Sequence, residues 1–186
     1  MKKTNKTRYA ILGMLFDKAR SGYDIKKFME ESTAHFWQET DASIYPMLKK
    51  LEAEGKVKSR ELLRGKRGRM LYSITQAGKA EFVSWMDKQV EQNPYRNELL
   101  LKLFFGASVA HTTIIKHLTA HQKKIEQGLK EFDYITTYVL SEVPDDNPHK
   151  PFWQMALRYG VLYNQAEAQW INECIQKLKQ TKIDKE

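Results

Sequence analysis

The sequence predicts a mostly α-helical protein with one small two-stranded β-hairpin, built as two domains in succession. Apolar residues recur at helical spacing through most of the 186 residues, as amphipathic helices require. Residues 57–74 instead alternate as two strands do around a basic, glycine-containing loop. Beyond residue 111 the apolar residues follow a heptad, which is typical of long paired helices. The change falls at Asn93-Pro94, so we expect domains at residues 1–90 and 91–186.

Three helices open the first domain. The first covers Ala10–Phe16, and Ser21-Gly22 separates it from a second helix over about residues 23–36. The third covers about residues 41–54, because Pro46 is compatible with a helix only near its start. This helix places four apolar residues on one face: Ile44, Met47, Leu48 and Leu51.

A β-hairpin and a fourth helix complete the first domain. The strands are predicted near Val57–Leu63 and Met70–Ile74, where apolar and polar residues alternate. The fourth helix opens at Thr75 or Gln76 and continues to about Gln89. Its inner face is expected to hold four apolar residues: Phe82, Val83, Met86 and Val90. Three helices and a two-stranded hairpin in this order describe a winged helix-turn-helix domain.

The second domain consists mainly of long helices. The segment YRNELLLKLFFG at residues 95–106 predicts a short and heavily buried helix. A long helix over residues 111–141 carries a heptad seam: Leu118, Gln122, Ile125, Leu129, Phe132, Thr136 and Val139. After the loop VPDDNPHKP, the last helix carries a similar stripe: Phe152, Ala156, Tyr159, Tyr163, Ala166, Trp170 and Cys174. A short loop between two long helices favours an antiparallel hairpin.

The excess of positive charge lies entirely in the first part of the chain. Residues 1–75 hold 17 Lys and Arg against 9 Asp and Glu, a net charge of +8, whereas residues 76–186 hold 14 of each. The formal charge of the whole chain is also +8. This asymmetry is expected where the first domain alone meets a polyanion such as nucleic acid. The alternative is that the charge merely keeps the protein soluble.

The loop between the two strands concentrates cations. Arg64, Lys66, Arg67 and Arg69 are interrupted by two glycines that permit a tight reversal. Four cations within six positions repel one another, so folding alone does not favour them. Along the minor groove of DNA such side chains are stabilised by the negative potential. The alternative is a solvated loop, which the nearby third helix disfavours.

The third helix has a second, polar face that resembles a DNA-reading surface. Its members are Ser43, Tyr45, Pro46, Lys49 and Lys50, beside the small residue Ala42. Hydroxyl groups donate to phosphates or base edges, and lysines supply charge. The alternative is an ordinary wet face of an amphipathic helix. Cations of the N-terminal arm are expected to add backbone contacts: Lys2, Lys3, Lys6 and Arg8.

Residues 8–87 resemble the DNA-binding domain of the PadR family of bacterial transcriptional regulators. The match rests on three motifs in order: the SGYDI turn, the IYPMLKKLEAEG helix and the stretch YSITQAG. The segment NELLLKLFFG and the long helices after it are similar, more loosely, to the longer helical C-terminal domain of PadR itself.

The resemblance implies a homodimer that binds an inverted-repeat operator in double-stranded DNA, usually as a repressor. It implies that the C-terminal helices supply much of the dimer contact, and that a small aromatic effector such as a phenolic acid releases DNA in some members. By position, the family's DNA-contacting helix falls on residues 43–50 and its wing on Arg64–Arg69.

No motif fixes the residues of an effector pocket. Aromatic side chains that suit a planar ligand, with an arginine for its carboxylate, are Trp85, Trp153, Arg158, Tyr159 and Tyr163. The more frequent role of such a stripe is in a core or a dimer interface.

Other classes of protein find less support. No apolar run reaches the length of a membrane span, and the apolar part of MKKTNKTRYAILGMLF is too short for a secretory leader. The single Cys174 suits the reducing cytoplasm.

We expect no enzyme and no cofactor, because no nucleophile–base pair, paired carboxylates or phosphate-binding loop is evident. His117 and His121 lack a third metal ligand. A winged-helix protein-interaction module is the main alternative, which Lys49 and Lys50 disfavour.

Overall fold

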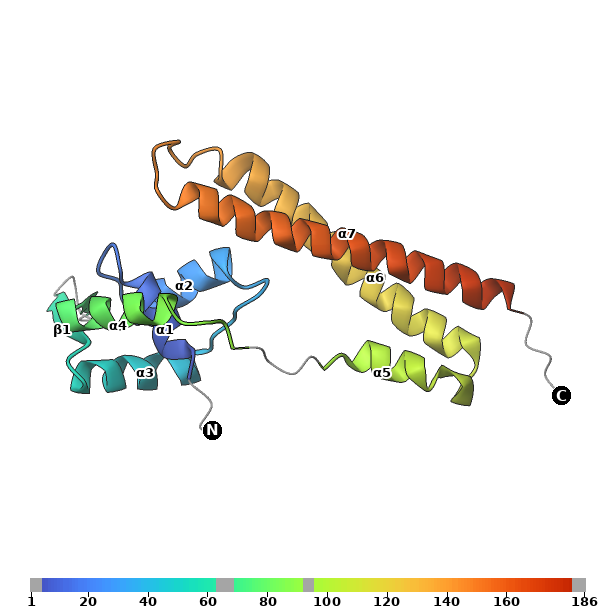
Figure 1. Ribbon diagram of the computed structural model, residues 1–186, viewed down its shortest axis with the longest axis horizontal. Helices are drawn as coiled ribbons and strands as arrows, with labels where there is room; N and C mark the ends of the chain where they lie inside the picture. The colour runs from blue at the N-terminus through green and yellow to red at the C-terminus, as the bar shows by residue number, and fades with distance from the viewer. Residues whose placement is uncertain (1–4, 63–68, 92–95, 182–186) are drawn as a thin grey trace. The chain divides into compact units, whose positions relative to one another are not determined.

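The computed structural model describes residues 5–62, 69–91 and 96–181 (Figure 1). The chain divides into two compact units, residues 1–92 and 93–186. The first unit holds four helices and a two-stranded antiparallel sheet: α1 (Thr7–Met14), α2 (Gly22–Ser32), α3 (Asp41–Ala53), β1 (Val57–Leu62), β2 (Arg69–Ile74) and α4 (Gln76–Met86). The predicted fold, mostly helical with a two-stranded wing, is confirmed.

One hydrophobic core holds the first unit together, and α3 lies against it. The predicted inner face of α3 is confirmed, since Ile44, Leu48 and Leu51 are fully buried. They pack with buried residues of α1 and α2, including Ile11, Leu12 and Ile25. The same core contains Leu15, Met29 and Val57. Burying such a side chain contributes about 1.5–3 kcal/mol. The core therefore fixes which face of α3 remains exposed to solvent.

The sheet is tied to the segment between α1 and α2. β1 and β2 pair with Val57 opposite Ile74 and Leu62 opposite Arg69. Arg20 forms an isolated antiparallel β-bridge with Tyr72 of β2. The Arg20 N–H donates to Tyr72 O at 3.0 Å, and the Arg20 carbonyl accepts from Tyr72 N at 2.8 Å. The wing is thereby joined to the start of α2.

The inner face predicted for α4 is wrong for Val83, Met86 and Val90, whose side chains are 49%, 61% and 91% exposed. The helix ends at Met86, so Val90 lies beyond it. Instead Phe82 and Trp85 pack against the core. A helix of three turns buries only one narrow face. Phe82 and Trp85 are three residues apart and therefore lie on that face.

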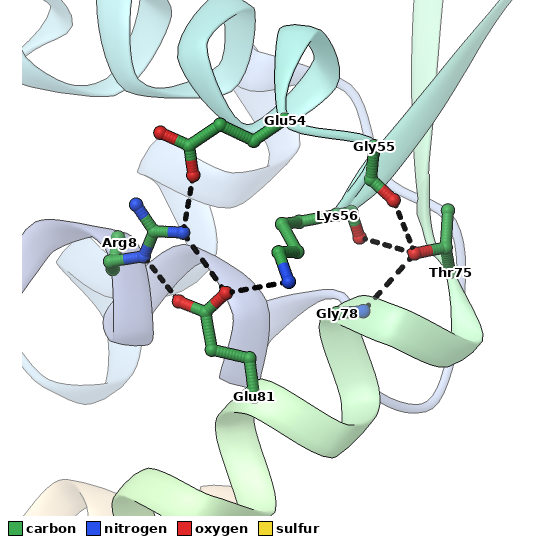
Figure 2. Close-up of polar contacts among 7 residues, drawn as sticks. All are labelled: Arg8, Glu54, Gly55, Lys56, Thr75, Gly78 and Glu81. Carbon is green, nitrogen blue, oxygen red and sulfur yellow. Dashed lines mark hydrogen bonds and ion pairs between the residues drawn. The ribbon is translucent and has the colours of Figure 1, made fainter.

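Arg8 on α1 joins three elements through charged contacts (Figure 2). Its Nε donates to Glu81 Oε1 at 2.5 Å, and its Nη2 donates to Glu54 Oε2 at 2.6 Å. Lys56 Nζ adds an ion pair with Glu81 at 3.3 Å. Glu81 lies on α4 and Glu54 caps the C-terminal end of α3. The guanidinium therefore fastens α1 both to the end of α3 and to α4.

A close backbone contact holds the start of α4 against β1 (Figure 2). The Thr75 hydroxyl donates to the carbonyl of Gly55 at 2.7 Å and accepts from the Gly78 N–H at 3.1 Å. A Cβ atom on Gly78 would lie 2.1 Å from the carbonyl oxygen of Lys56. Only glycine permits this approach, which accounts for the last residue of the YSITQAG motif.

The second unit is built on a helical hairpin. Its elements are α5 (Glu98–Phe104), the short 3₁₀ turn η1 (Gly106–Ser108), α6 (His111–Tyr134), the π turn η2 (Ile135–Val139) and α7 (Lys150–Gln180). His111 Nδ1 lies 3.3 Å from Leu178 O, whereas His121 Nε2 lies 3.0 Å from Glu167 Oε1. The residue number of the partner on α7 thus falls as the residue number on α6 rises. The two helices are therefore antiparallel, and the predicted hairpin is confirmed.

The heptad seam of α6 is confirmed from Leu118 to Phe132 and is wrong at Thr136 and Val139. For Val139 the cause is the π turn, in which Leu140 N donates to Ile135 O at 2.9 Å. A π turn adds one residue, so the next seam position moves from Val139 to Leu140. Leu140 is accordingly 7% exposed and Val139 45%.

Most of the stripe predicted on the last helix lies outside the core of the hairpin. Phe152, Tyr159 and Tyr163 are 67%, 69% and 44% exposed, and only Trp170 and Cys174 join the core of the second unit. Seven partly or fully buried residues of α7 follow another heptad: Leu157, Val161, Asn164, Ala168, Ile171, Ile175 and Leu178. α7 is apolar on two faces, and periodicity alone does not reveal which one meets α6.

The expectation that α5 is heavily buried is also wrong. Only Leu99 and Leu103 pack against the core of the second unit. Leu101, Phe104 and Phe105 are 59%, 82% and 60% exposed. A helix of seven residues rests on its neighbour through one face, and its other face stays exposed in a single chain.

Replacing Arg8 by glutamine is expected to lower the free energy of unfolding by about 1–3 kcal/mol, between the effects of breaking exposed and buried ion pairs. Glu54 and Glu81 would keep their charges without the guanidinium between them. Lys27→Gln is the control, because it removes an exposed pair with Glu31 at 3.6 Å and should cost less than about 0.5 kcal/mol. Equal losses in the two variants, measured by chemical denaturation, would contradict this role.

The same substitution should flatten the pH dependence of stability. The hydrogen bond from Arg8 holds the pKa of Glu54 below its ordinary value. Partial burial alone would raise the pKa of Glu81, but hydrogen bonds from Arg8 and Lys56 lower it. A lowered pKa contributes stability above the ordinary glutamate value, and that stability is lost as the pH falls through the folded value. Arg8→Gln should therefore lose less stability on acidification than the parent protein.

Candidate nucleic-acid interface

The exposed face of α3 carries most of the residues that the sequence singled out. Tyr45, Pro46, Lys49 and Lys50 are exposed on the side away from the core. Ser43 is different, since it is only half-exposed. Its hydroxyl lies 2.6 Å from Glu39 Oε2 and accepts from the Thr40 N–H at 3.0 Å. Ser43 therefore stabilises the first turn of α3, while the other four side chains face solvent.

Tyr45 rests against the first turn of α2. Its ring lies so close to Gly22 that a Cβ atom there would be 2.5 Å from Tyr45 Cε1. The ring is still 42% exposed. Contact with glycine on one side and solvent on the other fixes the direction in which this side chain leaves α3.

The predicted tip of the wing lies mostly outside the described residues, including Arg64, Lys66 and Arg67. Arg69 is described at the first position of β2, where its Nη2 pairs with Asp24 Oδ1. Partial burial alone would raise the pKa of Asp24, but hydrogen bonds from Ser21 and the charge of Arg69 lower it. Asp24 is thus held ionised next to a cation of the wing.

Two further cations on the wing were missed by the sequence analysis. Lys58 and Arg60 are exposed at alternate positions of β1, on one face of the strand. Within the described residues, neither side chain forms a hydrogen bond or ion pair. The alternation of charge in VKSREL was the signal, because residues two apart on a strand share a face.

The N-terminal cations are placed differently from expectation. Arg8 is bound to Glu54 and Glu81, and Lys6 pairs with Glu91 at 3.3 Å. The expectation that these two belong to a free arm is wrong, because both form ion pairs within the first unit; their contact with DNA stays a prediction. Lys2 and Lys3 lie outside the described residues.

The aromatic residues considered for an effector do not gather within one unit. Trp85 belongs to the first unit, where it stacks on Tyr9 with ring centroids 4.6 Å apart. The other four lie on α7 in the second unit: Trp153, Arg158, Tyr159 and Tyr163. Two open hollows among the described residues, one on α6 and one beside α2, are lined by none of the five.

Two further features of the described residues bear on function. No group of three or more His, Cys, Asp or Glu side chains there is arranged to hold a metal ion. His121 pairs with Glu167 across the hairpin. None of the helices in this part of the chain has the length and apolar character needed to cross a membrane.

Two family models match the chain in succession. Residues 11–84 match the transcriptional regulator PadR-like family, and residues 95–179 match the family described as virulence activator alpha C-term. The two matches correspond closely to the two compact units.

Curated relatives match about half of the chain. The negative transcriptional regulator PadR of Bacillus subtilis is 37% identical over 100 residues, which cover 53% of this chain and 55% of that protein. A probable transcriptional regulator of Mycobacterium tuberculosis is 32% identical over 79 residues, 42% of each chain. The chain thus spans about half the length of the curated relatives that it matches.

Solved structures match over nearly the whole chain. A PadR-like transcriptional regulator from Bacillus cereus has a TM-score of 0.77 at 28% identity, covering 95% of this chain and 98% of its own. Bacillus subtilis PadR in complex with operator DNA has a TM-score of 0.86 at 24% identity, covering 95% and 99%. The same protein was solved with p-coumaric acid, with a TM-score of 0.77, 24% identity and coverage of 95% and 100%. At these lower identities the likeness shows the fold alone.

Proposed function

We propose that this chain, whose residues 11–84 match the PadR-like family of transcriptional regulators, is a repressor that binds an inverted-repeat operator in double-stranded DNA as a homodimer. One observation carries the proposal: α3 buries one face completely and exposes a cationic one, beside a cationic wing strand. Repression is supported by the Bacillus subtilis relative, which is a negative transcriptional regulator. Acting on genomic DNA, the protein would work in the cytoplasm.

In the proposed complex the exposed face of α3 enters the major groove. Lys49 and Lys50 neutralise phosphates, and Tyr45 donates its hydroxyl to a phosphate or base edge. Lys58 and Arg60 extend the charge along β1 toward the wing. Arg69 and the three cations that precede it in the sequence, Arg64, Lys66 and Arg67, contact the neighbouring minor groove or its phosphates. In this proposal residues 1–90 bind DNA, and residues 91–186 supply the dimer contact.

Exposed apolar side chains of the second unit support the dimer. Phe152, Met155, Tyr159 and Leu162 are 67%, 66%, 69% and 48% exposed along the first half of α7. Their spacing of three, four and three residues is that of a helix-pairing seam. Contiguous exposed apolar surface of this kind marks an interaction site. A second copy of the chain covers it and holds two recognition helices about 34 Å apart, one turn of DNA.

Lys49→Ala is expected to weaken binding to a duplex from upstream of the protein's own gene by roughly five- to twentyfold, and to reduce the salt slope of log Kd by about one. The control Lys130→Ala removes the same charge from an exposed position on α6 and should leave Kd nearly unchanged. Fluorescence anisotropy at several salt concentrations measures both. Absence of binding by the parent protein would instead favour the protein-interaction module.

Tyr159→Glu should convert dimers to monomers and weaken operator binding by more than tenfold, since two half-sites no longer bind together. The buried glutamate would lack a partner at the interface. Gln154→Glu adds the same charge to the same helix at an exposed position outside the seam, and should remain dimeric. Sedimentation analysis distinguishes the two, and a dimeric Tyr159→Glu variant would refute this interface.

We also propose that a small aromatic acid releases the protein from DNA. The support is the phenolic acid bound by the Bacillus subtilis relative, together with exposed aromatic residues beside Arg158 on α7. Addition of p-coumaric acid should raise the Kd for operator DNA, and Arg158→Gln should reduce that effect. An unchanged Kd at millimolar acid would contradict the proposal.

A further inference from the structure

We propose that the first turn of α2, residues 21–24, sets the positions of two DNA-contacting side chains: Arg69 of the wing through Asp24, and Tyr45 of α3 over Gly22. The inference rests on the proposed function and assigns a role to the SGYDI motif. Asp24 and Gly22 are then positioning residues, because each acts on DNA through another side chain.

Asp24 uses its two carboxylate oxygens for different partners. Oδ2 accepts from the Ser21 backbone N–H at 3.1 Å and from the Ser21 hydroxyl at 2.9 Å. Ser21 Oγ in turn accepts from the Asp24 N–H at 3.1 Å, which completes a capping box. Oδ1 is left to pair with Arg69 Nη2. The hydrogen bonds from Ser21 therefore fix the position of the carboxylate independently of Arg69.

The backbone fixes the distance between this anchor and the wing. Arg20, directly before the capping residue Ser21, exchanges two backbone hydrogen bonds with Tyr72 on β2. Arg69 lies three residues earlier on the same strand. Asp24 and the base of Arg69 are thus parts of one hydrogen-bonded frame. An arginine that is 49% exposed would otherwise sample many rotamers, and ordering it on binding costs free energy.

Gly22 positions the side chain of Tyr45 through van der Waals contact with its ring. The absent Cβ leaves room for the ring, whose Cε1 would lie 2.5 Å from such an atom. Gly22 is buried at the first position of α2. A methyl group there must displace the ring of Tyr45, and with it the hydroxyl that is proposed to reach DNA.

The proposal makes an unusual prediction for charge. Removing a carboxylate from a DNA-binding surface ordinarily strengthens binding, because one repulsion with phosphates is lost. If Asp24 positions Arg69, Asp24→Asn must weaken binding instead. Asparagine keeps an oxygen that accepts from Ser21, so the cap persists while the ionic partner of Arg69 is removed.

The test is a double-mutant cycle on operator affinity, with Asp24→Asn, Arg69→Gln and the double variant. Each single variant should raise Kd by roughly five- to twentyfold, and the double variant should be no weaker than Arg69→Gln alone. Glu31→Gln is the control, since it removes the same charge from the last turns of α2 and should leave binding equal or tighter. Circular dichroism and melting temperature verify that each variant is folded.

Gly22→Ala provides an independent arm that does not depend on the cap. It should weaken binding in the parent protein and have no further effect in a Tyr45→Ser background, where no ring is displaced. Gly128→Ala, whose Cβ atom would meet only Asn164 Oδ1 at 3.7 Å, is the matched control and should bind as the parent does.

The outcomes separate this inference from the proposed function. Tighter binding by Asp24→Asn, or additive effects of Asp24→Asn and Arg69→Gln, would overturn the role of Asp24. Full affinity of Gly22→Ala would overturn that of Gly22. In either case a weakened Lys49→Ala variant would leave the proposed function intact. Failure of the parent protein to bind DNA would overturn both.

Discussion

The structure depends on the complete burial of one face of α3. Ile44, Leu48 and Leu51 lie at 0% exposure against α1 and α2, so the helix has a single orientation in which to pack. Its remaining face, with Lys49 and Lys50, is therefore exposed as a consequence of the core. A rigid helix with a fixed cationic face is what groove recognition requires, because each misplaced contact loses most of its energy.

Contacts outside the core fix the position of α3 relative to the neighbouring elements. Arg8 secures the C-terminal end of α3 to α1 and α4, and the first turn of α2 contacts both α3 and β2. Each of these contacts joins a few residues, whereas the hydrophobic core is formed by several elements of the first unit together. The second unit follows the same division, with an apolar seam between α6 and α7 and a separate apolar stripe left exposed on α7. One stripe stabilises the hairpin, and the other is the surface for which we propose a second copy.

Periodicity predicted the elements well, but several packing details were beyond it. The α3 face followed from spacing, because that helix has one strongly apolar side, and the antiparallel hairpin followed from the short loop between two long helices. Val139 failed because a π turn depends on local backbone hydrogen bonds that no spacing rule anticipates. Periodicity also did not reveal that Tyr159 lies outside the hairpin core, because α7 has two apolar stripes and the partner of each depends on tertiary packing. For the candidate site, a run of cations was visible in sequence, whereas the pairing of Arg8 with Glu54 and Glu81 joins residues far apart in the chain.

The central claim is that α3 and the wing form the surface that meets DNA. Amide chemical shifts of the labelled protein, followed while operator duplex is added, test it most directly. We expect the largest changes from Tyr45 to Lys50 and along β1 and β2, with smaller changes on α6. Changes confined to the second unit, or none on α3 at saturation, would contradict the account.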